Sequence, residues 1–353
     1  MQKVRKGEEL KEETLKQFLL ENKIINDINS ALNVVQFPGG YSNLTYAINV
    51  ENKDYVLRRP PFGAVKRGHD MGREYKVLSK LNPVFPKAPR TYIYSENNEI
   101  IGAPFYIMEK VDGTIIRPNN VKHLNISEND FKSIANSWLE TFVELHQVDY
   151  KSVGLEDLGK PEGYVERQVL NWGKQYIKAA TDEIPNAEKV INWLEKNQPN
   201  EYNSTLIHND FKYDNIVYAK GNWSKVVAVL DWEMCTLGDP LMDLGTSLSY
   251  WFTADDPPWL TIGLPMTTAE PGNPGRLEIV ELYEKMSGRK VDHLVFYYAY
   301  GLFKIAVIVQ QIYYRYKKGY TTDERFAQLN KATQAFINTA WQAIQKNRIV
   351  DLY

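Results

Sequence analysis

A single cysteine, Cys235, occurs among the 353 residues of this sequence, so no disulfide can form within the chain. There is no basic excess either, because 42 lysines and arginines are set against 44 aspartates and glutamates, for a formal net charge of −2. Proteins that coat nucleic acid need a basic surface, and this composition does not supply one. We therefore expect a cytoplasmic protein, in a reducing compartment, with no nucleic-acid partner.

An apolar leader and a long uncharged hydrophobic run are also missing. The first twenty residues mix Lys and Glu and hold no apolar stretch before a small-residue cleavage site, which predicts no secretory signal. The most apolar segment, Phe296 to Tyr314, is near the length of a membrane span, but Lys304 lies within it and Gln310 and Gln311 follow. We expect a buried helix there and no membrane association.

The residues that are present suffice for a large core, since 43% are hydrophobic, and the length predicts two domains. Up to about residue 111, β-branched and aromatic runs alternate with glycine and polar turns, which is typical of a small sheet. From residue 112 the pattern is mainly helical, with strands only within residues 205–233. We predict an α+β bilobal fold, with a small β-rich lobe over 1–111 and a larger, mostly helical lobe over 112–353 that contains a β-hairpin. The helices are expected at 8–21, 70–81, 128–148, 164–180 and 186–197.

The strongest motif is the segment HNDFKYDN, from His208 to Asn215. It has the form H-x-D-x-x-x-x-N, and sixteen residues later the apolar run VVAVL leads into Asp231. This order and spacing are those of a kinase catalytic loop followed by a metal-binding aspartate. A loop carboxylate at Asp210 can accept the proton of a substrate hydroxyl, and the oxygens of Asn215 and Asp231 are hard ligands of the kind that Mg²⁺ takes. The alternative is that Asp210 and Asp214 are ordinary turn residues and Asn215 a strand-starting one.

Two further segments lie upstream. Gly39, Gly40, Ser42 and Asn43 fall between two predicted strands, where glycines let a backbone approach phosphates and the polar side chains add donors; an ordinary hairpin turn is the alternative. Arg58 ends a predicted strand, and Glu74 lies on the following helix. A cation paired with a helix carboxylate can steer nucleotide phosphates, although Arg58 could equally be an exposed residue at a strand end.

Taken together, these residues, with Met108-Glu109 and the run LDWEMCTLGDPLMDLG, resemble the aminoglycoside phosphotransferase and choline kinase-like family. YVLRRPP and VLDWEMCTLGDPLMDLG are most similar to the branch of kinase domains attached to certain acyl-CoA dehydrogenases. The resemblance runs from about Val34 to Arg325. It implies a protein-kinase-like fold and the transfer of a phosphoryl group from ATP or GTP to a small-molecule hydroxyl, with Mg²⁺ as cofactor.

The resemblance also implies roles for individual residues. Asp210 matches the catalytic aspartate, and His208 matches the histidine that braces its loop. Asn215 and Asp231 match the metal-binding pair. Arg58 and Glu74 match the phosphate-steering pair, and the backbone of Glu109, Lys110 and Val111 matches the hinge that holds the purine. Gly238, Asp239 and Asp243 match a segment that supports the catalytic loop.

Three departures from kinase patterns stand out. Arg58 replaces the usual lysine, so a planar fork takes the place of a point charge. Trp232 and Glu233 stand where protein kinases have Phe-Gly, which argues against a protein kinase. Lys212 follows Asp210 by two residues and could neutralise charge on the moving phosphoryl group or simply point to solvent. A degenerate nucleotide-binding protein on the same fold is the competing hypothesis, although a binding module has no use for a catalytic base.

The acceptor is the least specified part of the prediction. Residues 270–353 hold 12 Lys/Arg and 8 Asp/Glu, a local net charge of +4, which favours an anionic hydroxyacid or hydroxyacyl-CoA over a polycationic aminoglycoside. Aromatic residues of the helical lobe, including Tyr250 and Trp251, are expected to be mostly core, with a minority lining the acceptor pocket. Cys235 is expected to be a buried structural residue. The oligomeric state is left open by the sequence.

Overall fold

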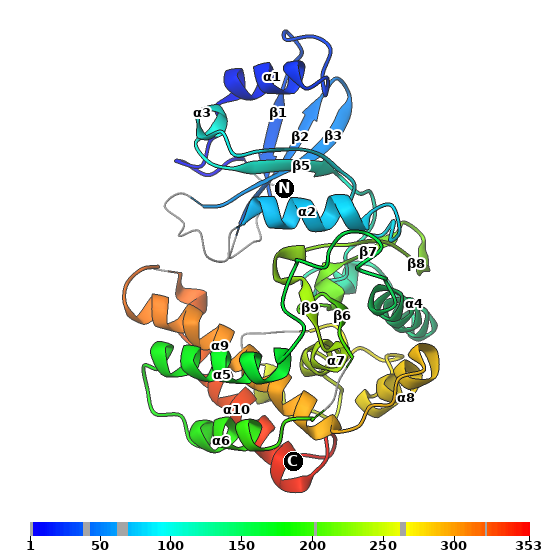
Figure 1. The fold of residues 1–353 in the computed structure, drawn as a ribbon, viewed down its shortest axis with the longest axis vertical. Helices are drawn as coiled ribbons and strands as arrows, with labels where there is room; N and C mark the ends of the chain where they lie inside the picture. The colour runs from blue at the N-terminus through cyan, green and yellow to red at the C-terminus, as the bar shows by residue number, and fades with distance from the viewer. Residues whose placement is uncertain (1–2, 38–42, 62–69, 201–202, 262–265, 322) are drawn as a thin grey trace. The chain divides into compact units, whose positions relative to one another are not determined.

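The computed structural model describes residues 3–37, 43–61, 70–200, 203–261, 266–321 and 323–353 (Figure 1). The chain forms two compact units. The first comprises Met1–Gly113 together with Val227–Cys235, and the second comprises Thr114–Val226 and Thr236–Tyr353. The segment Val227–Cys235, which includes Asp231, therefore belongs to the first unit. A division of the chain at residue 111 assigns this segment to the second lobe instead.

A five-stranded antiparallel sheet forms the centre of the first unit, with the strand order β1-β2-β3-β5-β4. Its strands are β1 (Asn33–Gln36), β2 (Leu44–Val50), β3 (Lys53–Arg59), β4 (Thr91–Ser95) and β5 (Phe105–Glu109). Glu51 and Asn52 join β2 to β3 with φ angles of 49° and 59°. A two-residue connection with two positive φ angles matches the twist of a hairpin, which explains the tight turn here.

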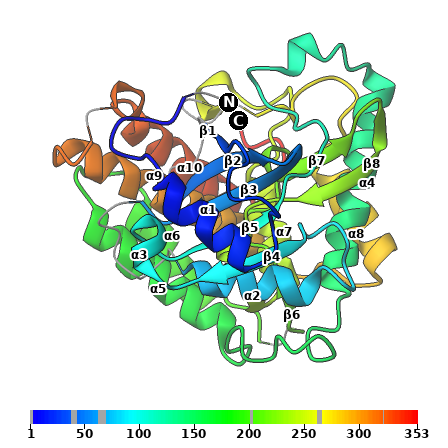
Figure 2. The same ribbon diagram turned by 90° about the horizontal axis from the view of Figure 1, so that it is seen from above.

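The two faces of this sheet are covered by different helices, α1 (Glu12–Glu21) and α2 (Met71–Leu81), as Figures 1 and 2 show. Leu15 and Leu19 of α1 pack into one core with Leu57 of β3. Since successive strand residues point to opposite faces, Arg58 lies on the other face, which α2 covers. There it is paired in register with Thr45 on one side and Tyr106 on the other.

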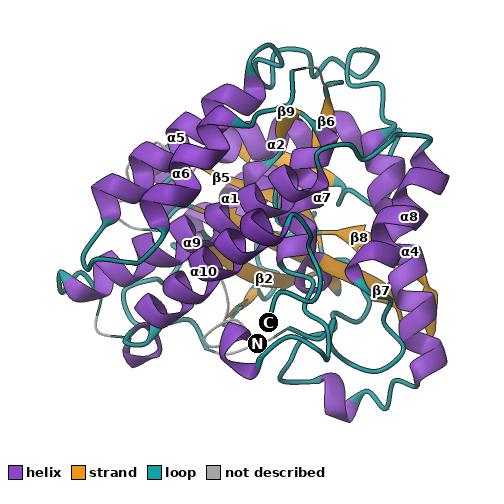
Figure 3. Cartoon of the chain, turned by 90° about the horizontal axis from the view of Figure 1, so that it is seen from below, coloured by secondary structure: helices purple, strands orange, loops and turns teal. Residues whose placement is uncertain are grey.

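The second unit is mainly helical (Figure 3). Its helices are α4 (Glu128–His146), α5 (Tyr164–Ala179), α6 (Ala187–Lys196), α7 (Pro240–Ser249), α8 (Arg276–Ser287), α9 (Leu294–Lys317) and α10 (Leu329–Lys346). Its strands are β6 (Thr205–Ile207), which pairs with β9 (Thr236–Gly238), and β7 (Ile216–Ala219), which pairs with β8 (Asn222–Val229). The division between the two units falls within β8.

Helix α9 is the central helix of the second unit and packs against α5, α7 and α10. By length and composition it is the one helix of the described residues that could cross a membrane, and 78% of its most apolar window is buried inside the protein. Where α7 crosses α9, a Cβ on Gly245 would lie 2.2 Å from the carbonyl oxygen of Tyr297. The absence of a side chain at Gly245 therefore allows the two backbones to touch.

The predicted α+β protein-kinase-like fold class is confirmed, with a small antiparallel sheet in one unit and helices with a β-hairpin in the other. The predicted helices are present, the first beginning at Glu12 rather than Glu8. Two short elements were not predicted. The polar turn near Asn97 contains the one-turn helix α3 (Asn98–Ile101), and strand β9 lies where helix was expected to resume.

Candidate active site

The first unit holds a cluster of charged side chains around Arg58. Its Nη1 donates to Glu74 Oε1 at 2.6 Å, and its Nη2 donates to Asp231 Oδ1 at 3.1 Å. A carboxylate oxygen of Glu233 lies 3.6 Å from the same Nη2 and accepts a hydrogen bond of 2.9 Å from Asn43 Nδ2. The planar fork of one arginine therefore holds a helix carboxylate and a loop carboxylate at the same time.

Burial sets the energetics of this cluster, since Arg58 is 8% exposed and Glu74 is 2% exposed. Burial acts to lower the pKa of Arg58, but the charge of Glu74 and the other nearby acids outweighs it and holds the pKa well above the ordinary value. Burial raises the pKa of Glu74, and the guanidinium opposes that rise. Arg58 is thus a permanently charged group fixed beneath the sheet, and the expectation of an Arg58–Glu74 pair is met by direct contact.

Asp231 is positioned by an unusual backbone conformation. Its φ is +68°, in the left-handed region that non-glycine residues rarely adopt, two residues after the end of β8. The next residue, Trp232, is 1% exposed, donates from Nε1 to the carbonyl of Val229 at 2.7 Å, and packs its ring edge-on to Phe85. This buried anchor fixes the turn, so the Asp231 side chain, 37% exposed, projects from a rigid base.

The second unit holds the other cluster, on the loop between β6 and β7. Asp210 accepts hydrogen bonds from Lys212 Nζ at 2.8 and 2.9 Å on its two carboxylate oxygens. Asn215, in the 3₁₀ turn Tyr213–Asn215, donates from Nδ2 to the backbone and a carboxylate oxygen of Asp210, both at 2.9 Å. The side chain of Asp210 remains 16% exposed. The structure therefore brings together three of the predicted residues in one hydrogen-bonded group.

Lys212 is held from two sides. Its ammonium lies 4.5 Å from the centre of the Tyr250 ring, and Asp210 receives two of its hydrogen bonds. Burial acts to lower the pKa of Lys212, but the Asp210 carboxylate outweighs it and raises the pKa. Lys212 is therefore a charged group in contact with the candidate base, and the alternative of a lysine pointing to solvent does not describe it.

The loop itself is fastened by Asp243, which is fully buried on α7. Its carboxylate accepts the backbone N–H groups of His208 and Asn209 at 2.7 and 2.8 Å, and His146 lies 3.2 Å from it. Burial would raise the pKa of Asp243, but the hydrogen bond and charge of His146 lower it below the ordinary value. His208 is buried and accepts the N–H of Asp210 on Nδ1 at 3.3 Å, so it contacts the loop and not solvent.

Asp239 and Gly238 support the same region. Asp239 caps α7 by accepting the Leu241 N–H at 2.8 Å, and the Tyr297 hydroxyl donates to its second oxygen at 2.7 Å. Burial raises the pKa of Asp239 to about 6. A Cβ on Gly238 would lie 2.6 Å from the ring of Tyr164.

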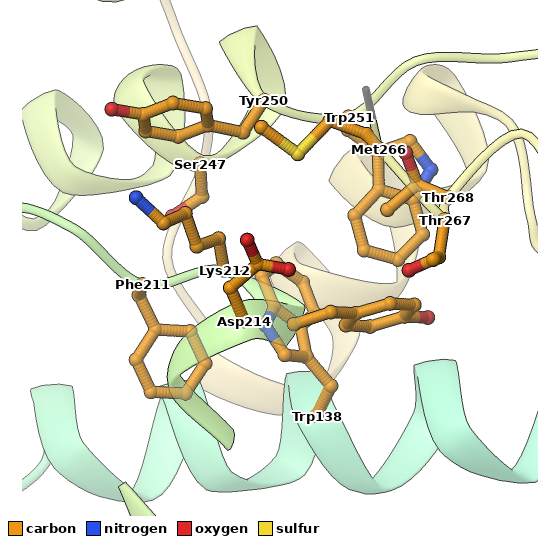
Figure 4. A pocket seen from close by; sticks show the side chains of 11 residues that line it. Trp138, Phe211, Lys212, Asp214, Ser247, Tyr250, Trp251, Met266, Thr267 and Thr268 are labelled. Carbon is orange, nitrogen blue, oxygen red and sulfur yellow. The ribbon is translucent and has the colours of Figure 1, made fainter. Parts of the chain in front are cut away.

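A small pocket borders the Asp210 loop within the second unit (Figure 4). Figure 4 shows Lys212 and Tyr250 on one side, Thr267 and Thr268 across from them, and the Asp214 carboxylate between. The other lining residues are Trp138, Phe211, Tyr213, Ser247, Trp251 and Met266. The walls are thus largely aromatic, with hydroxyls and two charged groups at defined places.

Four buried polar atoms of residues that line this pocket have no hydrogen-bond partner within the part of the chain that the structure describes. They are the indole Nε1 of Trp138 and the hydroxyl oxygens of Ser247, Thr267 and Thr268. Buried polar groups are nearly always paired, so atoms of this kind point to a bound water or ligand. Of the aromatic residues expected near an acceptor, Tyr250 and Trp251 line the pocket.

The predicted purine-holding segment is at the end of β5. The Glu109 carboxylate accepts the Arg90 N–H at 2.8 Å, and Lys110 Nζ pairs with Asp54 at 2.6 Å on the surface. Neither side chain enters a buried site, and the backbone N–H of Glu109 donates to the Arg90 carbonyl at 2.8 Å, so the other backbone groups of Glu109 to Val111 are the candidate contact. Gly39, Gly40 and Ser42 lie outside the described residues, and Asn43 is placed by its hydrogen bond to Glu233.

Sequence reasoning missed several residues of these clusters. Glu233 was noted only as a departure from protein kinases, and its contacts with Arg58 and Asn43 join residues 175 and 190 positions apart. The polar atoms of Trp138 and Thr267 carry no motif. Lys304 was visible as a charge within an apolar run, and this was the one signal that it has a specific partner. Cys235 is buried, as expected.

Comparison with known proteins identifies the family. A family model, APH, described as the phosphotransferase enzyme family, matches residues 33–267. The chain belongs to the phosphotransferase enzyme family. The APH match covers the sheet of the first unit as well as the Asp210 loop, and so includes both clusters.

Relatives among curated proteins carry the kinase-like segment as part of a longer chain. Acyl-CoA dehydrogenase family member 10 of Mus musculus is 30% identical over 345 residues, which cover 97% of this chain and 32% of that protein. Acyl-CoA dehydrogenase family member 11 of Homo sapiens is 34% identical over 299 residues, which cover 84% of this chain and 38% of that protein. The chain thus spans about a third of the length of these relatives, and the predicted resemblance to their branch is confirmed.

Solved structures agree in fold. A crystal structure from Ralstonia eutropha JMP134, provisionally named an aminoglycoside phosphotransferase, is 29% identical with a TM-score of 0.81, covering 96% of this chain and 99% of that one. Aminoglycoside phosphotransferase APH(4)-Ia, in complex with AMP-PNP and hygromycin B, gives 14% identity and a TM-score of 0.57, covering 92% and 98%. Plasmodium vivax ethanolamine kinase gives 13% and 0.57, covering 91% and 86%. At these lower identities the likeness concerns the fold alone.

Proposed function

We propose that this member of the phosphotransferase family is a Mg²⁺-dependent small-molecule kinase that moves the γ-phosphoryl group of ATP or GTP to an alcohol hydroxyl. The observation that carries the proposal is the arrangement around Asp210. Its carboxylate is partly exposed, fixed by Asn215 and in contact with the Lys212 ammonium. A fixed, accessible carboxylate beside a cation is what proton transfer from a hydroxyl acceptor requires.

In this proposal Asp210 orients the acceptor hydroxyl and takes its proton as the new O–P bond forms, while the bond between the γ-phosphorus and the β,γ-bridging oxygen of the nucleotide breaks and releases ADP or GDP. In the structure the Lys212 ammonium donates to both carboxylate oxygens of Asp210. To neutralise charge on the phosphoryl group, it would have to redirect one of these hydrogen bonds to that group or to the acceptor. His208 does not touch the reacting atoms and serves to brace the loop. Arg58, held by Glu74, supplies the fixed positive charge for the nucleotide phosphates. The purine would contact the backbone of 109–111.

The residues proposed for Mg²⁺ fit a hard cation by their chemistry. Both hydrogen bonds of the Asn215 amide to Asp210 come from Nδ2, which leaves its carbonyl oxygen for a ligand. Asp231 offers a carboxylate that is 37% exposed on a rigid turn. These two oxygens would hold the ion, with the remaining ligands from phosphate and water, and the ion would neutralise phosphate charge. The AMP-PNP in the APH(4)-Ia complex supports ATP as the donor.

We place one end of the acceptor in the pocket beside Lys212 and Asp214. The free space inside the pocket is about that of one water molecule, so it would take a single small polar group of the acceptor, such as one hydroxyl, and not the whole molecule. Its unpaired hydroxyls and indole N–H suit hydroxyl and carbonyl oxygens. An anionic hydroxyacid or hydroxyacyl-CoA remains our proposed acceptor class, supported by the +4 balance of residues 270–353 and by the acyl-CoA dehydrogenase names of the relatives.

The test measures Mg²⁺-dependent phosphoryl transfer from ATP and GTP to a library of hydroxyacids, hydroxyacyl-CoAs, sugars, choline-like amines and aminoglycosides. Asp210→Asn should lower turnover by about 10²- to 10⁴-fold, because the base is lost, and leave nucleotide binding intact. Asp292→Asn, at an exposed carboxylate of the second unit, is the matched control and should retain turnover.

Two results would contradict the proposal. Absence of any Mg-nucleotide binding or transfer across the library would reject the activity, and full turnover in Asp210→Asn would reject the assigned base. Nucleotide binding without transfer to any acceptor would favour a degenerate binding module. Transfer to aminoglycosides alone would overturn the acceptor class. A cytoplasmic location, the absence of nucleic-acid and membrane partners and the oligomeric state stay open to direct measurement.

A further inference from the structure

A buried ammonium group lies beneath the loop that carries Asp210. Lys304 is on α9, and only 1% of the residue is exposed. Its Nζ donates to the backbone oxygen of Asn209 at 2.8 Å and to the side-chain oxygen of Asn209 at 3.0 Å. Lysine is almost never fully buried unless its ammonium has hydrogen-bond partners, and here Asn209 provides both of them.

Asn209 is the residue between His208 and Asp210, and its backbone is in the left-handed region with a φ of +68°. The Asp243 carboxylate accepts the N–H groups of His208 and Asn209 on one side. Lys304 binds the carbonyl of Asn209 on the other. This carbonyl belongs to the same planar peptide as the N–H of Asp210, so fixing it fixes the plane from which the Asp210 side chain departs.

We propose that Lys304 is a positioning residue of the catalytic loop: its ammonium holds the Asn209–Asp210 peptide and so sets the direction in which Asp210 presents its carboxylate. The proposal rests on the function proposed for Asp210 above. Among the described residues, Lys304 forms no hydrogen bond or ion pair with Asp210 or with a pocket residue, so its effect on chemistry acts through Asn209.

The charge of Lys304 has a cost that packing alone does not explain. Burial lowers its pKa to about 8, while the Asp243 and Asp210 charges act to raise it and Lys212 lowers it further. Helix α5 adds the Tyr164 hydroxyl beside Asn209, and the buried faces of α6 and α10 hold no charged side chain. An apolar residue of similar size would fill this place without the cost of a buried charge. The hydrogen bonds of the Lys304 ammonium to Asn209 therefore account for a charged residue at this buried position.

The experiment compares Lys304→Met with a control on the same helix, Gln310→Met. Gln310 is also 1% exposed, and its Nε2 donates to the Ala179 carbonyl at 2.8 Å and to Thr181 Oγ1 at 3.0 Å, so its replacement likewise removes buried hydrogen bonds to a backbone carbonyl. Two experiments are done on each variant: one measures amide hydrogen exchange of the peptide covering 205–216, and the other measures kcat and KM for MgATP hydrolysis with water as the acceptor.

For Lys304→Met we expect exchange in the 205–216 peptide to rise while peptides of α7 and α10 keep their protection. The hydrolysis kcat should fall by about 10²-fold, the cost of a misplaced catalytic group, with the KM for MgATP within about threefold of its original value. Gln310→Met should show neither change. Lys304→Arg, which keeps charged donors, should recover part of the kcat.

The pH profile supplies a readout that a merely structural lysine would not move. The wild-type kcat should decline as pH rises through about 8, where Lys304 loses its proton, and this step should be absent from Lys304→Met. Unchanged kcat and unchanged loop exchange in Lys304→Met would overturn the proposal, as would an equal loss in Gln310→Met. If the wild type neither hydrolyses MgATP nor transfers its phosphoryl group to any acceptor of the library, the proposed function fails, and the exchange data alone still decide whether Lys304 holds the loop.

Discussion

Replacing Arg58 by methionine tests whether the buried Arg58–Glu74 pair is the electrostatic anchor of the first unit. The substitution keeps an unbranched side chain but removes the fork that lies 2.6 Å from Glu74 and 3.1 Å from Asp231. Glu74 is 2% exposed, so its carboxylate would remain buried without a cation. Removing one partner of a buried ion pair costs about 3–5 kcal/mol, and we expect this loss at pH 7.5.

The loss should depend on pH in a direction fixed by Glu74. Burial already raises the pKa of Glu74, and without the opposing guanidinium the pKa rises further. A carboxyl whose folded-state pKa is raised favours the folded state below its unfolded pKa, near 4.5, and this stabilisation is lost as the pH rises through the folded value. As the pH falls from 7.5 towards 5, a larger fraction of Glu74 is protonated, so the loss should shrink towards the cost of unmade hydrogen bonds, about 1–3 kcal/mol.

The assay is peptide-resolved hydrogen exchange of β3 and α2 across a urea series at the two pH values, which reports on the first unit separately from the second. Arg58→Met/Glu74→Leu should recover most of the loss, since an apolar pair of similar volume replaces the ion pair. Arg90→Met, at an exposed arginine of the same unit, should change stability by no more than about 0.5 kcal/mol. A loss that is the same at both pH values, or a double variant no more stable than the single one, would refute the reasoning.

Two further predictions concern the second unit. Asp239→Asn keeps the oxygen that caps α7 but removes a carboxylate whose pKa burial raises to about 6. Burial disfavours the ionised form of Asp239, so the wild type loses folding stability as the pH rises from about 4 through 6, and the variant does not. The free energy of unfolding of the variant relative to the wild type should therefore increase by up to about 3 kcal/mol between pH 4 and pH 7.5, measured by thermal unfolding. A difference that stays constant with pH would count against the prediction. Gly245→Ala forces a Cβ to within 2.2 Å of the Tyr297 carbonyl and should cost about 3 kcal/mol or more in denaturant unfolding. Gly275→Ala, where a Cβ meets open space, is the control and should cost less than about 1 kcal/mol.

Much of the fold could be predicted because its elements have a strong local pattern. The helix over 70–81 begins at its capping residue Asp70, which accepts the Arg73 N–H at 3.0 Å, and ends near Asn82-Pro83, so its bounds are written in the sequence. Strand β9 has only three residues and exists because it pairs with β6, some thirty positions earlier. An element that depends on a distant partner leaves little local signal, and helix was expected there instead.

The candidate site divides in the same way. Asp210 and Asn215 are five residues apart on one loop, and their spacing alone indicated that they act together. The contact between Arg58 and Asp231 joins residues 173 positions apart, and that between Lys304 and Asn209 joins residues 95 positions apart. Such pairs are set by how the elements pack, which residue spacing does not encode. A family resemblance supplied the role of Arg58, whereas nothing of that kind pointed to Lys304.

The buried charges of the chain favour a catalyst over a binding-only module. Arg58 with Glu74 in the first unit, and Lys304 with Asp243 in the second, are taken out of water at a cost that apolar side chains would not carry. A module that only binds nucleotide could use a fixed cation such as Arg58. It would gain nothing from Asp243 and Lys304, whose hydrogen bonds end on the two residues before Asp210. These contacts fix the direction of the Asp210 carboxylate. The free-energy cost of burying Asp243 and Lys304 is explained if that carboxylate accepts a proton during phosphoryl transfer.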